Sequence, residues 1–88
     1  MLRKIIVVTL TDSGVKYQNV FTQSSLACET MVSWVREIAK EYDMSFDEFN
    51  KIENDIRTSC YYGSVNDINI DLDRYQISYR EFKVDFIF

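Results

Sequence analysis

One short stretch of the chain has residues whose type and spacing could bind a metal ion. Residues 66–73, NDINIDLD, alternate acidic or amide side chains with Ile and Leu. Asp67, Asn69 and Asp71 match the first three ligand positions of a calcium-binding EF-hand loop. That loop also requires a glycine for its sharp turn and a glutamate at its twelfth position, where this chain has a leucine and a serine. The sequence therefore excludes a calcium loop, and no metal or cofactor is expected.

The chain lacks the sequence features of the common enzyme classes. It contains no histidine, no GxSxG motif and no glycine-rich phosphate loop. Carboxylate pairs such as Asp47 and Glu48 occur, but acid–base catalysis needs a carboxyl group held in an apolar pocket, and these acids are expected to be exposed. Cys28 and Cys60 are 32 residues apart and form no CxxC motif, and this pattern is typical of reduced cytosolic thiols. A single disulfide between them is the alternative. We expect a protein that is not an enzyme.

Acidic residues are concentrated in the second half of the chain. Residues 1–44 contain five basic and five acidic residues, whereas residues 45–88 contain five basic and nine acidic ones. The net charge of −4 therefore belongs entirely to the second half. Because binding to a phosphate backbone needs a concentrated basic surface, this balance disfavours direct nucleic-acid binding and favours a basic protein partner.

The acidic row at residues 66–73 has two interpretations. It is either the solvated outer face of a half-buried strand or a surface that recognises a partner. Recognition is supported because Asp and Asn are poor strand formers and like charges on one face repel each other. On a strand the row would repeat every ~6.6 Å, a spacing similar to that of successive phosphates. The candidate residues are Asp67, Asn69, Asp71 and Asp73, with Asp47, Glu48, Glu53, Asp55 and Asp85 as further contributors.

Aromatic residues provide a second candidate surface. Tyr61 and Tyr62 flank a predicted turn, and tyrosine can combine apolar contact area with a hydrogen bond at an interface. Their alternative role is to fill the rim of the core. The apolar segment FKVDFIF, residues 82–88, would invite pairing as an uncovered edge strand. We therefore expect this segment to be covered, or to form the contact of a homodimer.

The periodicity of apolar residues predicts the elements that position these side chains. Two strands, two helices and two further strands are expected in that order, at residues 2–11, 15–22, 24–42, 46–60, 65–73 and 75–88. Ser45 and Glu48 form a capping box at the start of the second helix. In the last strand the apolar alternation shifts by one position, which predicts a β-bulge near Arg80 and Glu81.

These elements predict an α+β fold in which a mostly antiparallel four-stranded sheet carries two helices on one face. With 88 residues, no proline and only two glycines, the chain is expected to form a single compact domain, residues 1–88. No segment approaches the ~20 apolar residues of a membrane span. A cytoplasmic location is therefore expected, and a membrane is not an expected partner.

In its size, its acidity and its lack of catalytic motifs, the chain resembles the small acidic αβ proteins that phages make to block host enzymes. These include anti-restriction and anti-CRISPR inhibitors, some of which imitate nucleic acid. The resemblance is one of general character and implies a non-enzymatic inhibitor that binds a basic surface of a larger nucleic-acid-handling protein. The alternative is a structural or assembly module that acts as a small homodimer.

Overall fold

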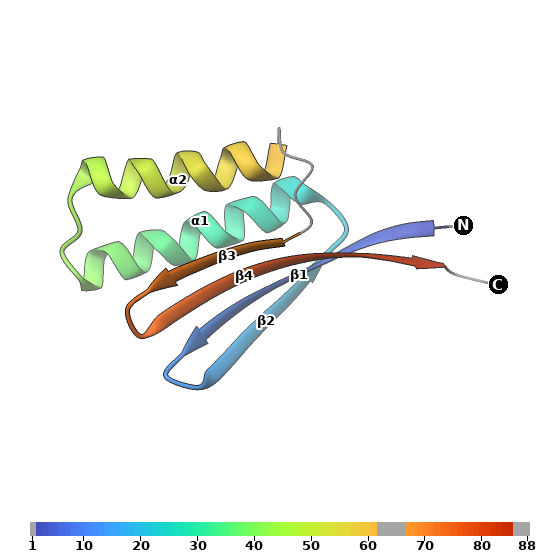
Figure 1. Cartoon of the computed structure of the whole chain (residues 1–88), viewed down its shortest axis with the longest axis horizontal. Helices are drawn as coiled ribbons and strands as arrows, with labels where there is room; N and C mark the ends of the chain where they lie inside the picture. Colours follow the sequence, from blue (N-terminus) through green and yellow to red (C-terminus); the bar gives the residue numbers. More distant parts are fainter. Residues whose placement is uncertain (1, 62–66, 86–88) are drawn as a thin grey trace.

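The computed structural model describes residues 2–61 and 67–85 of the chain. They form one antiparallel sheet with two helices on one side, so the predicted α+β fold and its ββααββ order are confirmed (Figure 1). The strand order in the sheet is β2-β1-β4-β3. The elements are β1 (Leu2–Asp12), β2 (Val15–Phe21), α1 (Ser24–Glu41), α2 (Phe46–Tyr61), β3 (Asp67–Leu72) and β4 (Tyr75–Asp85).

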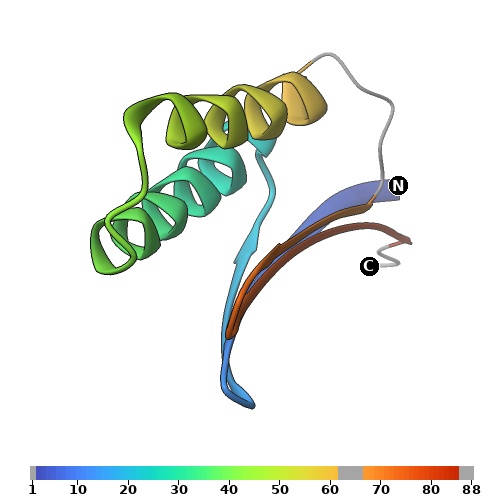
Figure 2. The same ribbon diagram turned by 60° about the vertical axis from the view of Figure 1, so that its left-hand side comes forward.

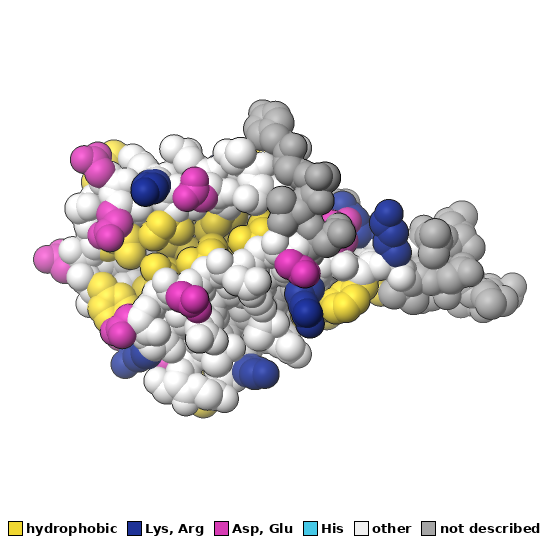
Figure 3. All heavy atoms as spheres, viewed as in Figure 1, with side chains coloured by type: hydrophobic (Ala, Val, Ile, Leu, Met, Phe, Trp, Pro, Cys, Tyr) yellow, Lys and Arg dark blue, Asp and Glu magenta, His cyan; other side chains and the backbone are white. Residues whose placement is uncertain are grey.

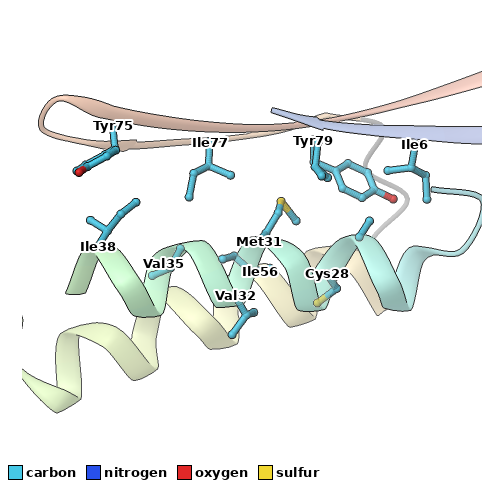
Figure 4. Packing of buried hydrophobic residues seen from close by; sticks show 12 residues of the cluster. Ile6, Cys28, Met31, Val32, Val35, Ile38, Ile56, Tyr75, Ile77 and Tyr79 are labelled. Carbon is cyan, nitrogen blue, oxygen red and sulfur yellow. The ribbon is translucent and has the colours of Figure 1, made fainter. Parts of the chain in front are cut away.

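The core lies between α1 and the two central strands of the sheet. Strand alternation sends one set of side chains from β1 and β4 toward the helices, and the central members of this set are apolar and removed from water. The helix contributes apolar residues at helical spacing, of which Met31 and Ile38 point toward the sheet while Cys28 and Val32 point away from it, toward α2 (Figure 4). The buried residues include Ile6, Val8, Ile77 and Tyr79 from the sheet and Cys28, Met31, Val32, Val35 and Ile38 from α1.

The second helix, α2, packs against α1. Ile56 is buried, whereas Phe49 and Ile52 are half-buried at the edge of the core. Arg57 joins the two helices, because its guanidinium bonds both Glu53 on α2 and Glu29 on α1. Figure 2 shows that the sheet is curved, with the helices on its convex side and no described helix or strand on its concave side.

The two hairpin turns lie together and are tied to the end of α1. Arg74 Nε is 3.3 Å from a carboxylate oxygen of Asp12, and Arg74 Nη2 is 2.7 Å from one of Glu41. The Tyr75 hydroxyl donates to Glu41 and accepts from Arg74. The backbone N–H of Ser13 donates to the carbonyl of Arg74 at 3.3 Å. One cationic side chain therefore fixes the relative position of both hairpins and the helix.

The predicted β-bulge near Arg80 and Glu81 is wrong. β4 pairs with β1 in one unbroken register, from Leu2 opposite Asp85 to Asp12 opposite Tyr75. The apolar pattern shifts because Phe82 faces the concave side of the sheet, opposite Ile5, where it is 45% exposed. Apolar side chains therefore occur on both faces of the sheet near this end.

The predicted apolar segment at residues 82–88 is only partly paired. Residues 82–85 belong to β4 and pair with β1, but no described strand pairs with their other side, and residues 86–88 lie outside the described residues. β2 reaches only to Phe21, opposite Ile6, and β3 begins opposite Arg80. Within the described chain, the paired ends of β1 and β4 beyond β2 and β3 thus form a two-stranded arm, which projects past the rest of the sheet (Figure 1).

Among the described residues, neither α1 nor α2 is long and apolar enough to cross a membrane.

Candidate interaction surface

The acidic row lies on β3, an edge strand of the sheet. Asp67, Asn69 and Asp71 are exposed and alternate with three half-buried apolar residues, as predicted for a strand with one solvated face. Residues 65 and 66 of the predicted strand lie outside the described residues. The three polar side chains are on the concave face of the sheet, opposite the side that carries the helices. A strand holds them extended in a line, which is not the folded-back conformation of a calcium loop.

Asp73 does not continue this row, although the sequence pattern placed it there. β3 ends at Leu72, and Asp73 lies in the following turn with a φ angle of 56°. Asp is one of the few residues that adopt this left-handed conformation readily, because its short side chain can bond to the local backbone. The row therefore has two carboxylates with an amide between them.

The charges of the row are unequally balanced. Asp67 pairs with Arg80 on β4, directly opposite in the register, with Oδ1 3.8 Å from Nε. Asp71 is opposite Gln76, and no ion pair of Asp71 occurs among residues 2–61 and 67–85. Asp71 is therefore the carboxylate on β3 with the most charge available to a partner.

The four candidate acids of α2 divide into two kinds. Asp47 and Glu48 are exposed in the first turn, where the helix dipole favours negative charge, and the backbone N–H of Glu48 donates to Ser45 Oγ at 3.2 Å. Asp55 is exposed further along the helix. Glu53 is only 22% exposed and is bound by Arg57 of the same helix at 3.1 Å, so much of its charge is already neutralised. Its spacing of four residues from Arg57 is the sequence signal that predicts this pair.

An apolar groove separates α2 from β3. It has a volume of about 210 Å³, and its lining includes Ile52, Asp55, Ile56 and Ser59 from α2 with Ile68 and Ile70 from β3. Figure 3 shows hydrophobic side chains along this line, with acidic side chains around them. Apolar periodicity predicts only that these isoleucines face the interior, so it does not predict the groove.

The charge imbalance of the protein lies on the two elements that border this groove. α2 and β3 together contain six acidic and two basic residues, a net charge of −4 that equals the net charge of the whole chain. We call the exposed carboxylates on these two elements the acidic surface. Its members are Asp47, Glu48, Asp55, Asp67 and Asp71.

The remaining candidate residues do not join the acidic surface. Tyr61 is the last residue of α2 and is 49% exposed, while Tyr62 lies outside the described residues. The backbone of Asp85 ends β4 opposite Leu2, in the projecting arm, and its side chain lies outside the described residues. β3 starts only opposite Arg80, so Asp85 is placed well beyond the acidic row.

The two cysteines are free thiols that face each other between α1 and α2. Burial is the main cause that raises the pKa of the Cys60 thiol to about 12, and burial also raises the pKa of Cys28. Raised pKa values leave little thiolate, which is the nucleophilic form. This pair is therefore unsuited to nucleophilic chemistry. Among residues 2–61 and 67–85, no three Asp, Glu or Cys side chains are grouped to hold a metal ion.

Comparison with protein-family models, with curated proteins and with solved structures found no match to this chain. A functional assignment must therefore rest on the fold and the side chains described above. They define a small α+β protein with an acidic surface beside an apolar groove.

Proposed function

We propose that this protein is a non-enzymatic inhibitor that binds a basic surface of a larger nucleic-acid-handling protein. The observation that carries the proposal is the concentration of the whole net charge on α2 and β3, with five exposed carboxylates on these two elements. Such a surface attracts a basic partner at a distance and then pairs with its Lys and Arg side chains. It would compete with nucleic acid for the same basic groove, in the cytoplasm.

Imitation of a nucleic-acid strand by β3 alone would be incomplete. Asp67 and Asp71 are four residues apart, so their Cα atoms are separated by ~13 Å. This spacing matches alternate phosphates, and Arg80 weakens one of the two charges. The carboxylates of α2 must therefore supply much of the attraction, and the partner must contact α2 and β3 together.

Charge reversal at one residue of the acidic surface tests the proposal. Asp71→Lys changes the net charge by the same amount as Glu37→Lys, whose side chain is 70% exposed on α1 and outside the acidic surface. If each exposed pair contributes up to about 1 kcal/mol, replacing an attraction by a repulsion should cost ~1–2 kcal/mol, a 5- to 30-fold loss of affinity.

The measurement is affinity capture from a lysate of the source cell or its host, followed by a competition assay with the captured protein's nucleic acid. We expect the wild type and Glu37→Lys to capture a nucleic-acid-binding protein and to displace its nucleic acid, and Asp71→Lys to do both poorly. Capture should weaken as salt rises. Equal behaviour of the two variants would refute the proposal.

A homodimer is the second candidate, and one observation favours it. The concave face of the sheet exposes Phe82 and Val20, which are 45% and 64% exposed, and the arm formed by β1 and β4 lacks flanking strands within the described residues. A second copy could cover these apolar side chains. Size-exclusion chromatography with light scattering measures this directly, and a monomer at high concentration contradicts it.

A further inference from the structure

β3 has a free edge among the described residues, because its only strand partner there is β4. Backbone N–H and C=O groups on such an edge are available to another extended chain. An added strand would alternate its side chains between the two faces of the sheet, as β3 does. The two faces of β3 therefore determine which sequence this edge can accept.

The face of β3 toward the helices would accept apolar side chains. Ile68 and Ile70 are half-buried there, and Ile52 of α2 lies across the groove from them. The groove opens beside the strand, where a neighbouring strand would place every second side chain (Figure 3). Filling it would remove partly exposed isoleucines from water, which is favourable at about 25 cal/mol per Å² of apolar surface.

The opposite face of β3 would accept basic side chains. Asp67 and Asp71 are exposed on it, and residues on adjacent strands that face each other have Cβ atoms about 4.5–5.5 Å apart. Lys or Arg at the intervening positions of an added strand would therefore pair with these carboxylates. Asp55 at the rim of the groove adds negative charge on the α2 side.

The other edge of the sheet offers a different environment. Residues Val15 to Val20 of β2 are exposed on both faces, and Lys16 is the one charged side chain of that strand. A basic segment would be repelled there by Lys16 and would find no row of carboxylates to pair with. The two edges thus predict a preference for β3 that can be measured.

We propose that β3 is the docking edge for an extended segment of the partner in which apolar residues alternate with Lys or Arg. The segment adds as a fifth strand, its apolar side chains enter the groove below α2, and its basic side chains cover the acidic row. This inference rests on the proposed function for the basic character of the partner, and it adds the conformation and pattern of the segment that is bound.

The probe is a synthetic peptide of alternating Val and Lys with capped ends, of the same six-residue length as β3. Two further versions carry N-methyl groups on alternate residues, one on each interleaved set of amides. A strand pairs through one set only, so we expect one N-methyl version to bind like the parent and the other to lose binding at least tenfold. Backbone amide NMR shifts should change in β3 and not in β2. Equal binding of both versions, or no binding, overturns the proposal.

A pair of protein variants tests the groove itself. Ser59 lines the groove, whereas Thr58 is exposed on the same turn of α2 and does not line it. Ser59→Arg adds the same charge as Thr58→Arg, and Arg is a better helix former than Ser or Thr, so both should fold. We expect peptide binding to fall at least tenfold in Ser59→Arg and much less in Thr58→Arg. Equal losses would mean that charge alone drives binding, which overturns the docking model.

These results separate the two proposals. If the peptide does not pair with β3 but capture of the partner still depends on Asp71, the docking edge is refuted and the proposed function stands. If the peptide pairs as expected but capture is indifferent to Asp71→Lys, the proposed function fails and the edge remains a binding site for peptides of this pattern.

Discussion

Ile56 is the side chain on which the attachment of α2 depends, so truncating it to alanine tests how the helix is held. It is 1% exposed, whereas the other apolar residues on this face of α2 are half-buried. Ile→Ala in a core costs about 2–5 kcal/mol, and we expect ~3 kcal/mol because the neighbouring groove lets water and side chains relax into the space. For a domain of this size the melting temperature should fall by roughly 12–24 °C.

Urea unfolding followed by far-UV circular dichroism measures this loss. The total stability expected for 88 residues is about 4–13 kcal/mol, so the variant should keep a folded baseline at low urea. Ile52→Ala is the matched control, since Ile52 lies on the same helix at the rim of the groove and should cost ~1 kcal/mol. A smaller loss from Ile56→Ala than from Ile52→Ala would refute the view that Ile56 anchors α2.

Three other perturbations follow from the side-chain contacts. Arg57→Met removes the bridge between the helices and should lower the free energy of unfolding by ~1 kcal/mol at low salt, as measured by urea unfolding. This loss of stability should shrink in concentrated NaCl, and a salt-independent loss would contradict an ionic origin. Tyr75→Phe removes the hydroxyl that bonds Glu41 and Arg74 and should lower the melting temperature by roughly 4–8 °C in calorimetry, whereas no change would mean that this bond contributes nothing. Cys60, with its pKa raised to about 12, should be alkylated roughly 1000-fold more slowly at pH 8 than a thiol of pKa 9.0, and its rate should rise about tenfold per pH unit until unfolding exposes it; rapid alkylation of the folded protein at pH 8 would contradict this.

The fold could be predicted because each element has a clear apolar period. Apolar residues recur at helical spacing in α1, and β3 alternates strictly between exposed and half-buried positions. Ser45 and Glu48 mark the start of α2, and the structure has the expected hydrogen bond between them. Periods and caps are local properties of the chain, so a single sequence reveals them.

The features that were missed depend on contacts between elements. Phe82 disturbs the alternation of β4 because the concave face of the sheet also carries apolar residues, and the sequence offers a bulge as an equally simple cause. The groove arises because α2 packs against α1 and leaves Ile68 and Ile70 of β3 partly exposed. The position of one element relative to another cannot be predicted from a local pattern of residues. The turn position of Asp73, in contrast, could have been predicted from the sequence, because an aspartate between two strands is a recognised turn signal.

The central pairing of β1 with β4 has a consequence for the order in which the protein folds. The first hairpin and the helix pair can form from neighbouring residues, but the middle of the sheet requires the long segment between Asp12 and Tyr75 to close into a loop. Loop closure costs entropy before its contacts are made, so this step should limit the folding rate. During synthesis one edge of β1 stays unpaired until β4 has left the ribosome. The strand that completes the core is thus also the one made last among those described, and chains interrupted before it should be recognised by chaperones or proteases rather than fold.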